Sequence, residues 1–98
     1  MSNRLTIRPE AEADIAEAFD WYEEQVLDLG SDFLLCLDAV LNEIRRNPLL
    51  YPQIHREARR ALVRRFPYQI LYVYDDETIT VIAVFHAKRN PKIWKKRL

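Results

Sequence analysis

Cysteine and glycine are almost absent from this sequence. Cys36 is the single cysteine, which excludes an internal disulfide, and a lone thiol in a helical pattern is typical of a reducing cytoplasm. Gly30 is the single glycine, which excludes the glycine-rich loops that bind phosphates. His55 and His86 lie far apart in the sequence and no cysteine cluster accompanies them. We therefore expect neither a metal site nor another cofactor.

Long apolar runs are absent as well. The longest such run covers about residues 79–85, far short of the roughly 20 residues that span a bilayer. The start of the chain passes from Arg4 directly into a strand-like run, whereas a signal peptide would continue with an apolar region. We therefore expect a cytoplasmic protein without a membrane partner. Because 49% of the 98 residues are hydrophobic, residues 1–98 are expected to form one domain around one core.

The first half of the chain has few basic residues, and the second half has few acidic residues. Residues 1–54 contain four basic and eleven acidic residues, whereas residues 55–98 contain eleven basic and four acidic residues. The net charge of zero thus hides a balance of −7 against +7. If the fold keeps these groups together, one face will be positive and will attract nucleic acid or an acidic protein. The alternative is a solvated surface that happens to be basic.

The first half predicts a strand and two helices. Leu5–Arg8 alternates apolar and polar residues, and the proline that follows suits the first position of a helix over Pro9–Leu27. Gly30 is expected to take the left-handed conformation that ends this helix, and Ser31 to cap a second helix over Asp32–Asn47. The short loop between the two helices indicates an antiparallel helical hairpin.

The second half predicts strands. The connector Leu49–Glu57 is followed by the strands Ala61–Val63, Tyr68–Tyr74 and Thr78–Ala87, and the tail from Pro91 is expected to form a helical turn or two. A polar turn joins the last two strands into a hairpin, and both have apolar residues on both faces, which favours the sheet centre. The order β-α-α-β-β-β indicates an α+β fold, with the helical hairpin on one face of a small, mainly antiparallel sheet. Basic residues are expected on the other face and along the tail.

Four short motifs follow one another along the chain. They are Asp14-x-x-x-Ala18-x-x-Trp21-Tyr22, Asn47-Pro48-x-x-Tyr51-Pro52, Arg65-Phe66-Pro67-Tyr68-x-Ile70-x-Tyr72, and His86-x-x-Arg89-x-Pro91-x-x-Trp94-x-x-Arg97. Together they resemble the RelE/ParE toxin superfamily, and in particular its ParE-like plasmid-stabilisation toxins, over nearly the whole chain. The resemblance implies the RelE/ParE-like fold and the toxin of a type II toxin–antitoxin pair.

The resemblance leaves three functions open, because members share a fold but not a target. ParE-type relatives inhibit DNA gyrase, and RelE-type relatives are metal-independent endoribonucleases that cleave messenger RNA in the ribosomal A site. The chain is thus expected to inhibit growth by binding a macromolecular target such as gyrase, or to be an mRNA interferase. The third possibility is an inactive member of the family that only binds its antitoxin. In each case we expect an antitoxin that lies along the helical hairpin and reaches the basic surface.

The catalytic candidates are His86 and Arg89, because RNA cleavage without a metal needs an acid, a base and cations around the phosphate. The resemblance aligns Gln69 with a position where nucleases of this group often carry a catalytic arginine. A glutamine has no charge to stabilise the reacting phosphate, so the sequence favours a toxin that is not an enzyme. The expected target-binding residues are Arg65, His86, Lys88, Arg89, Trp94 and Arg97.

Each candidate also has a structural interpretation. His86 could fix the path of the tail by a hydrogen bond, and Trp94 could pack the tail against the sheet instead of stacking on a base. Arg89 or Arg97 could pair with a carboxylate at the edge of the core. His55 is expected to be exposed in a loop. Three tyrosines are expected to share one strand face with their hydroxyls at its rim: Tyr68, Tyr72 and Tyr74.

Overall fold

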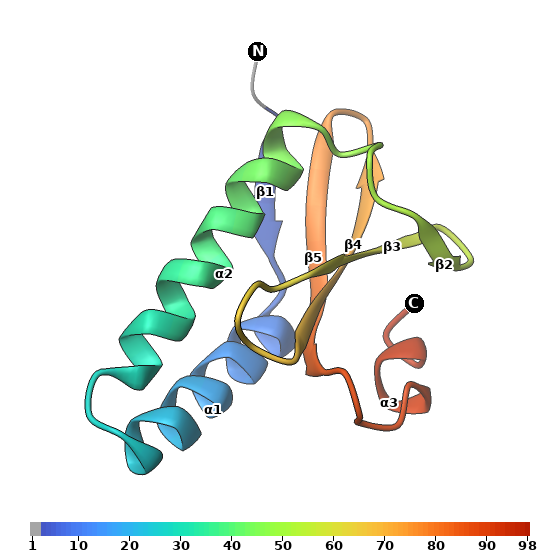
Figure 1. Cartoon of the computed structure of the whole chain (residues 1–98). Coiled ribbons are helices and arrows are strands. Elements are labelled where there is room, and N and C mark those ends of the chain that lie inside the picture. Colours follow the sequence, from blue (N-terminus) through green and yellow to red (C-terminus); the bar gives the residue numbers. More distant parts are fainter. Residues whose placement is uncertain (1–2) are drawn as a thin grey trace.

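The fold is built on a five-stranded sheet with the strand order β1-β5-β4-β3-β2 (Figure 1). The structure is a computed structural model, and it describes residues 3–98. The elements are β1 (Arg4–Ile7), α1 (Pro9–Gln25), α2 (Leu29–Arg46), β2 (Gln53–His55), β3 (Ala58–Leu62), β4 (Tyr68–Asp75), β5 (Thr78–His86) and α3 (Lys92–Lys95). β1 runs parallel to β5, and the other neighbouring strands are antiparallel. The predicted α+β class and mainly antiparallel sheet are confirmed.

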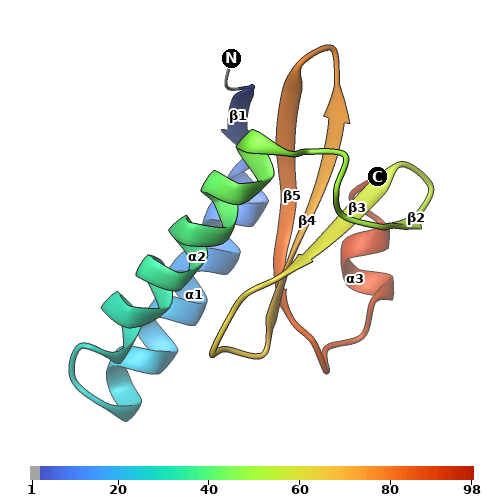
Figure 2. The same ribbon diagram turned by 45° about the horizontal axis from the view of Figure 1, so that its top comes forward.

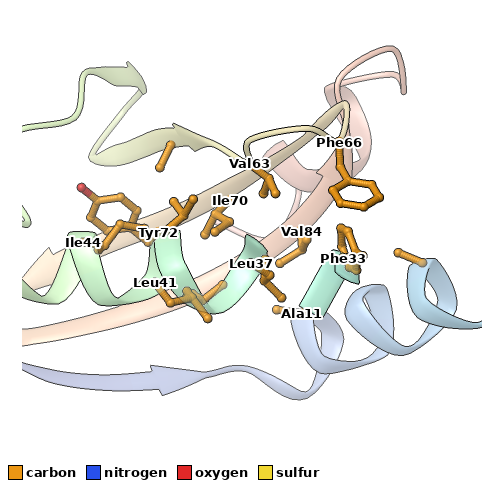
Figure 3. Close-up of a cluster of buried hydrophobic side chains, with 14 of the residues drawn as sticks. Ala11, Phe33, Leu37, Leu41, Ile44, Val63, Phe66, Ile70, Tyr72 and Val84 are labelled. Carbon is orange, nitrogen blue, oxygen red and sulfur yellow. The ribbon is translucent and has the colours of Figure 1, made fainter. Parts of the chain in front are cut away.

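The helices α1 and α2 form the predicted antiparallel hairpin and cover one face of the sheet (Figures 1 and 2). Each buries residues three or four positions apart, because that spacing repeats on one helical face. Their buried side chains meet those of the strands in a cluster that we call the main core (Figure 3). Its members include Ala11, Tyr22, Phe33, Leu37, Ile44, Phe66, Ile70, Tyr72, Ile79 and Val84.

The junction between the two helices differs from the prediction. Asp28, with a φ of 70°, takes the left-handed conformation, while Gly30 lies inside α2. A Cβ at Gly30 would lie 2.7 Å from Cγ of Glu23 and 2.8 Å from the carbonyl oxygen of Phe19, so glycine is needed for the close approach of the helices. Ser31 does not cap α2. Instead, the Glu23 carboxylate accepts the Gly30 N–H at 2.8 Å and the Ser31 N–H at 3.4 Å.

The strands of the second half also depart from the prediction at β2 and β3. β3 begins at Ala58 instead of Ala61, and β2 lies within the predicted connector, because a strand of three residues has too short a pattern to recognise. His55 therefore lies in a strand and is half-buried, with its ring centroid 5.9 Å from that of Trp94, and the expectation of an exposed loop histidine was wrong. The central hairpin of β4 and β5 is confirmed, and its turn residues Asp76 and Glu77 have φ values of 51° and 59°.

The opposite face of the sheet carries α3, which lies away from the helical hairpin in both views (Figures 1 and 2). Trp94 of α3 is 2% exposed and packs with Ala58, Leu71, Ile82, Ala83 and Phe85 in a smaller cluster that we call the tail cluster. The predicted helical turn in the tail is thus present. No helix within residues 3–98 has both the length and the apolar character that crossing a membrane requires.

Candidate functional site

A cleft of about 560 Å³ opens between α1 and the ends of β4 and β5. Its lining residues are Asp14, Glu17, Ala18, Trp21, Tyr22, Pro67, Tyr68, Val84, His86 and Arg89. Four of them, Asp14, Glu17, Ala18 and Trp21, are spaced at three- and four-residue intervals and so lie on one face of α1. The cleft therefore joins the acidic first half of the chain to the basic second half.

Aromatic rings form much of the sheet side of the cleft. Tyr68 and His86 are register partners on β4 and β5, and their ring centroids lie 5.4 Å apart. Burial raises the pKa of Tyr68. The neighbouring Tyr22 and Glu17 raise this pKa further, whereas the positive charge of Arg89 lowers it. The Tyr68 hydroxyl is therefore protonated at neutral pH and can donate a hydrogen bond into the cleft.

The hydrogen bond made by His86 decides what its ring can do. The backbone N–H of Lys88 donates to Nδ1 of His86 at 3.0 Å. With Nδ1 acting as an acceptor, the neutral ring carries its proton on Nε2. His86 is therefore arranged to donate from Nε2, whereas a general base would need a free lone pair there.

Arg89 lines the cleft, and Arg65 and Lys88 are exposed cations in the two loops that carry its lining residues Pro67 and Arg89; we call Arg65, Lys88 and Arg89 the basic rim. The Arg89 guanidinium lies 4.7 Å from the centre of the Phe85 ring, and that of Arg65 lies 5.7 Å from the centre of the Phe66 ring. Within residues 3–98 the two ion pairs are Arg64–Glu43 and Arg97–Asp14. The basic rim therefore keeps its positive charge available to an anion.

Trp94 and Arg97 are used within the fold, although the Arg97 guanidinium lies 4.9 Å from the centre of the same Phe85 ring that Arg89 contacts. Arg97 donates to the two carboxylate oxygens of Asp14 at 2.6 and 3.2 Å and to the carbonyl oxygen of Ile82 at 3.0 Å. Its side chain is 18% exposed, and Trp94 is 2% exposed. Both side chains therefore fasten the tail, as their structural interpretation expected, and a contact with the target stays a prediction for them.

Asp14 was missed as a functional position by the sequence interpretation. It is 9% exposed, and in addition to Arg97 it accepts the backbone N–H of Val84 at 3.1 Å. β1 ends before this point, so Asp14 and Arg97 satisfy the edge of β5 where no strand does. A carboxylate within the apolar stripe of a helix was the signal, because a buried charge requires a partner.

Gln69 lies on β4 as a buried side chain and is not among the residues that line the cleft. Its register partners are Phe85 on β5 and Leu62 on β3. The predicted rim position of the strand tyrosines is wrong for Tyr72, which is fully buried and donates to the carbonyl oxygen of Pro48 at 2.6 Å. Within residues 3–98 no three His, Cys, Asp or Glu side chains gather to hold a metal ion.

Comparison with known proteins identifies the family of the chain. The family model described as "ParE toxin of type II toxin-antitoxin system, parDE" matches residues 5–91. Toxin ParE2 of Mycobacterium tuberculosis (strain ATCC 25618 / H37Rv) is 32% identical over 92 residues, which cover 93% of this chain and 88% of that protein.

Solved structures share the fold at low sequence identity. A chain of the chromosomal ParDE toxin–antitoxin system from P. aeruginosa has a TM-score of 0.77 at 12% identity. The match covers 87% of this chain and 96% of the P. aeruginosa chain. A mutant of the E. coli toxin RelE in the free state has a TM-score of 0.73 at 19% identity, covering 99% and 95% respectively. From the matched family model and the ParE2 relative, we conclude that this chain belongs to the ParE toxin family of type II toxin–antitoxin systems.

Proposed function

We propose that this chain acts in the cytoplasm, as a single ParE-like domain, by binding a protein target through the basic rim and so stopping growth. DNA gyrase is the first candidate for that target. The observation that carries the proposal is a set of unneutralised cations beside an aromatic cleft whose histidine is not arranged as a base. Such a surface can bind an acidic partner without doing chemistry on it.

The cleft supports binding better than RNA cleavage. A metal-free nuclease needs a base for the 2′-hydroxyl group and a cation at the reacting phosphate. The Nδ1 atom of His86 already accepts a backbone hydrogen bond, and Gln69 is uncharged and outside the cleft lining. Arg89 can supply a charge but not a base.

A cognate antitoxin is the second partner that we propose. The solved relatives include a ParDE system from P. aeruginosa and the RelBE2 toxin–antitoxin complex of M. tuberculosis, which has a TM-score of 0.56 at 20% identity. By analogy, the antitoxin of this chain would lie along the helical hairpin and reach the basic rim. It would neutralise the toxin by covering Arg65, Lys88 and Arg89.

The proposal is tested with purified chain and purified gyrase in a plasmid supercoiling assay. We expect inhibition by the native chain and a loss of at least tenfold in potency for the double variant Arg65→Ala, Arg89→Ala. Arg64→Ala is the matched control, because Arg64 is an exposed arginine in the same loop that pairs with Glu43. Unchanged supercoiling at a large excess of the native chain would refute gyrase as the target.

The alternative is a ribosome-dependent mRNA interferase, which the position of His86, Tyr68 and Arg89 around one cleft favours. In that case the chain would cleave messenger RNA bound to programmed ribosomes. The variants His86→Ala and Arg89→Ala would each abolish this cleavage without unfolding the chain. Intact message under these conditions would exclude this function. The remaining alternative is an inactive member that only binds an antitoxin, and growth arrest on expression of the chain alone would exclude it.

A further inference from the structure

The cleft has a mainly apolar lining that no segment of residues 3–98 covers. Trp21 lines it and is 53% exposed, and Tyr22, Pro67 and Val84 form its floor and walls together with Tyr68. Exposed aromatic surface next to a concave apolar site is typical of a place where a partner inserts a side chain. The site therefore has room for one large apolar group from another molecule.

The α1 side of the cleft has one acid without an ion pair in its lining, Glu17, and further exposed acids lie on the same helix outside that lining. Glu10, Glu17, Asp20 and Glu24 are exposed, recur at helical spacing and have no ion pair among the described residues, and we call them the acidic stripe. α1 has no basic residue in its last turn, so Glu24 and Asp20 face the negative end of the helix dipole unopposed. A cation from a partner would relieve this local repulsion.

The opposite side of the cleft is basic, with Arg89 in its lining and Lys88 next to it in sequence. Tyr68 lies between the two charged sides. Its pKa, which burial raises most, is raised further by Glu17 and lowered by Arg89, so both charges act on the same point of the cleft. The two sides of the cleft therefore have opposite electrostatic preferences.

We infer that the cleft binds a short segment of a partner protein in one orientation. The segment inserts a large apolar side chain between Trp21 and Tyr68, places Lys or Arg against the acidic stripe, and places Asp or Glu against Arg89. A nucleic-acid strand fits less well, because its phosphates would lie against the carboxylate of Glu17 and beside the rest of the acidic stripe. This inference rests on the proposed function in one respect, since it assigns Arg89 to a protein-binding surface.

The test uses three synthetic peptides that share a central Leu-Phe pair and lack tryptophan. The first has lysines on one side of the pair and glutamates on the other, the second is all-lysine, and the third is all-glutamate. Binding to the intact chain is followed by the fluorescence of Trp21, because Trp94 is buried and gives a constant background. We expect a blue shift of the emission and the tightest binding for the mixed peptide, by about threefold over each single-sign peptide.

Variants separate the charge effect from the fold. Glu17→Lys combined with Asp20→Lys should weaken the mixed peptide about fivefold and strengthen the all-glutamate peptide. The matched control is Glu12→Lys combined with Asp38→Lys, which changes two exposed acids outside the cleft by the same amount and should leave binding unchanged. Thermal unfolding confirms that each variant is folded.

Two results would overturn the inference. One is equal affinity for the mixed and all-glutamate peptides, and the other is an unshifted Trp21 emission with all three peptides at millimolar concentration. Because binding is measured on the purified chain without gyrase or ribosomes, these results are independent of whether the chain inhibits growth.

Discussion

The main core and the tail cluster are closed in different ways. The main core lies between the helical hairpin and the sheet, and side chains from α1, α2 and several strands fill it. The tail cluster lies on the other face, where the four-residue helix α3 covers it with one large side chain, Trp94. The first cluster therefore determines whether the chain folds, and the second determines where its basic C-terminal tail lies.

The tail beside the tail cluster is also held by a partly buried ion pair. Asp14 reaches from α1 to Arg97 around the edge of β5, and the Arg8 guanidinium donates to the Arg97 carbonyl oxygen at 3.0 Å. Against these contacts, Nε1 of Trp94 is buried without a hydrogen-bond partner, which opposes the docking of α3. The tail is thus held by a few specific contacts, and each can be removed separately.

The largest effect is expected in the main core. Phe33→Ala removes a fully buried ring that packs against Tyr22, Phe66 and Tyr68, and should lower the free energy of unfolding by about 4 kcal/mol. Urea denaturation followed by circular dichroism measures the loss. A change below about 1 kcal/mol would mean that the hairpin is not essential to the core.

Removal of the partly buried ion pair should cost somewhat less. Asp14→Ala leaves Arg97 partly buried without its carboxylate and the Val84 N–H without an acceptor, so a loss of about 3 kcal/mol is expected. Trypsin should then cleave faster at Lys95 and Lys96, because the tail is released. Glu17→Ala, an exposed acid on the same helix, is the control and should leave tail cleavage unchanged. Equal cleavage rates in the native chain and Asp14→Ala would contradict this role.

The hydroxyl of Tyr72 gives a smaller effect that depends on pH. Tyr72→Phe removes the hydrogen bond to Pro48 and should cost about 1 kcal/mol at neutral pH. Burial raises the pKa of Tyr72 to about 12, above its ordinary value of 10.0. Between these pH values the unfolded chain loses a proton that the folded chain retains, so the stability of the native chain should fall as pH rises.

Urea titrations from pH 9 to pH 12 measure this dependence. The fall in the free energy of unfolding should be smaller for Tyr72→Phe than for the native chain, because phenylalanine cannot ionise. Tyr74→Phe removes a hydroxyl from the same strand and is the matched control. Parallel curves for the native chain and Tyr72→Phe would show that Tyr72 does not contribute to the alkaline loss.

The smallest effect is expected at the second ion pair of the described chain. Arg64 lies 3.3 Å from Glu43, but its side chain is 78% exposed, so water screens the attraction. Arg64→Ala should change the free energy of unfolding by less than about 0.5 kcal/mol. The same urea assay, run beside Asp14→Ala, sharpens the contrast between the two pairs. A loss similar to that of Asp14→Ala would show that exposure does not separate them.

Much of the fold could be predicted from local patterns. The stripe that includes Phe33 and Ile44 predicted α2, and the apolar residues on both sides of Tyr68–Tyr74 placed that strand in the sheet centre. Gly30 was misinterpreted because one glycine can serve a left-handed turn or a close helix contact, and only the position of Phe19 distinguishes them. β2 was missed because its pairing with β3 is a contact between segments, not a pattern within one.

The candidate site was predictable only in part. Arg65, His86, Lys88 and Arg89 were selected from the charge pattern and the motifs, and they border the cleft or the loops beside it. Trp21 and Glu17 were not selected as site residues, because nothing in a helical stripe tells which partner strand it will face. Asp14 and Arg97 are far apart in the sequence and become one unit only through the path of the tail.

The sequence by itself determined the helices, the central hairpin, the family resemblance and the segregation of charge, because each depends on residue type and short spacing. The tertiary structure decided which charges are free and which are used within the fold. Arg89 and Arg97 belong to the same basic tail, but Arg89 lines an open cleft while Arg97 pairs with Asp14. That difference depends on which distant groups the packing brings within hydrogen-bond distance, and no pattern along the chain contains that information.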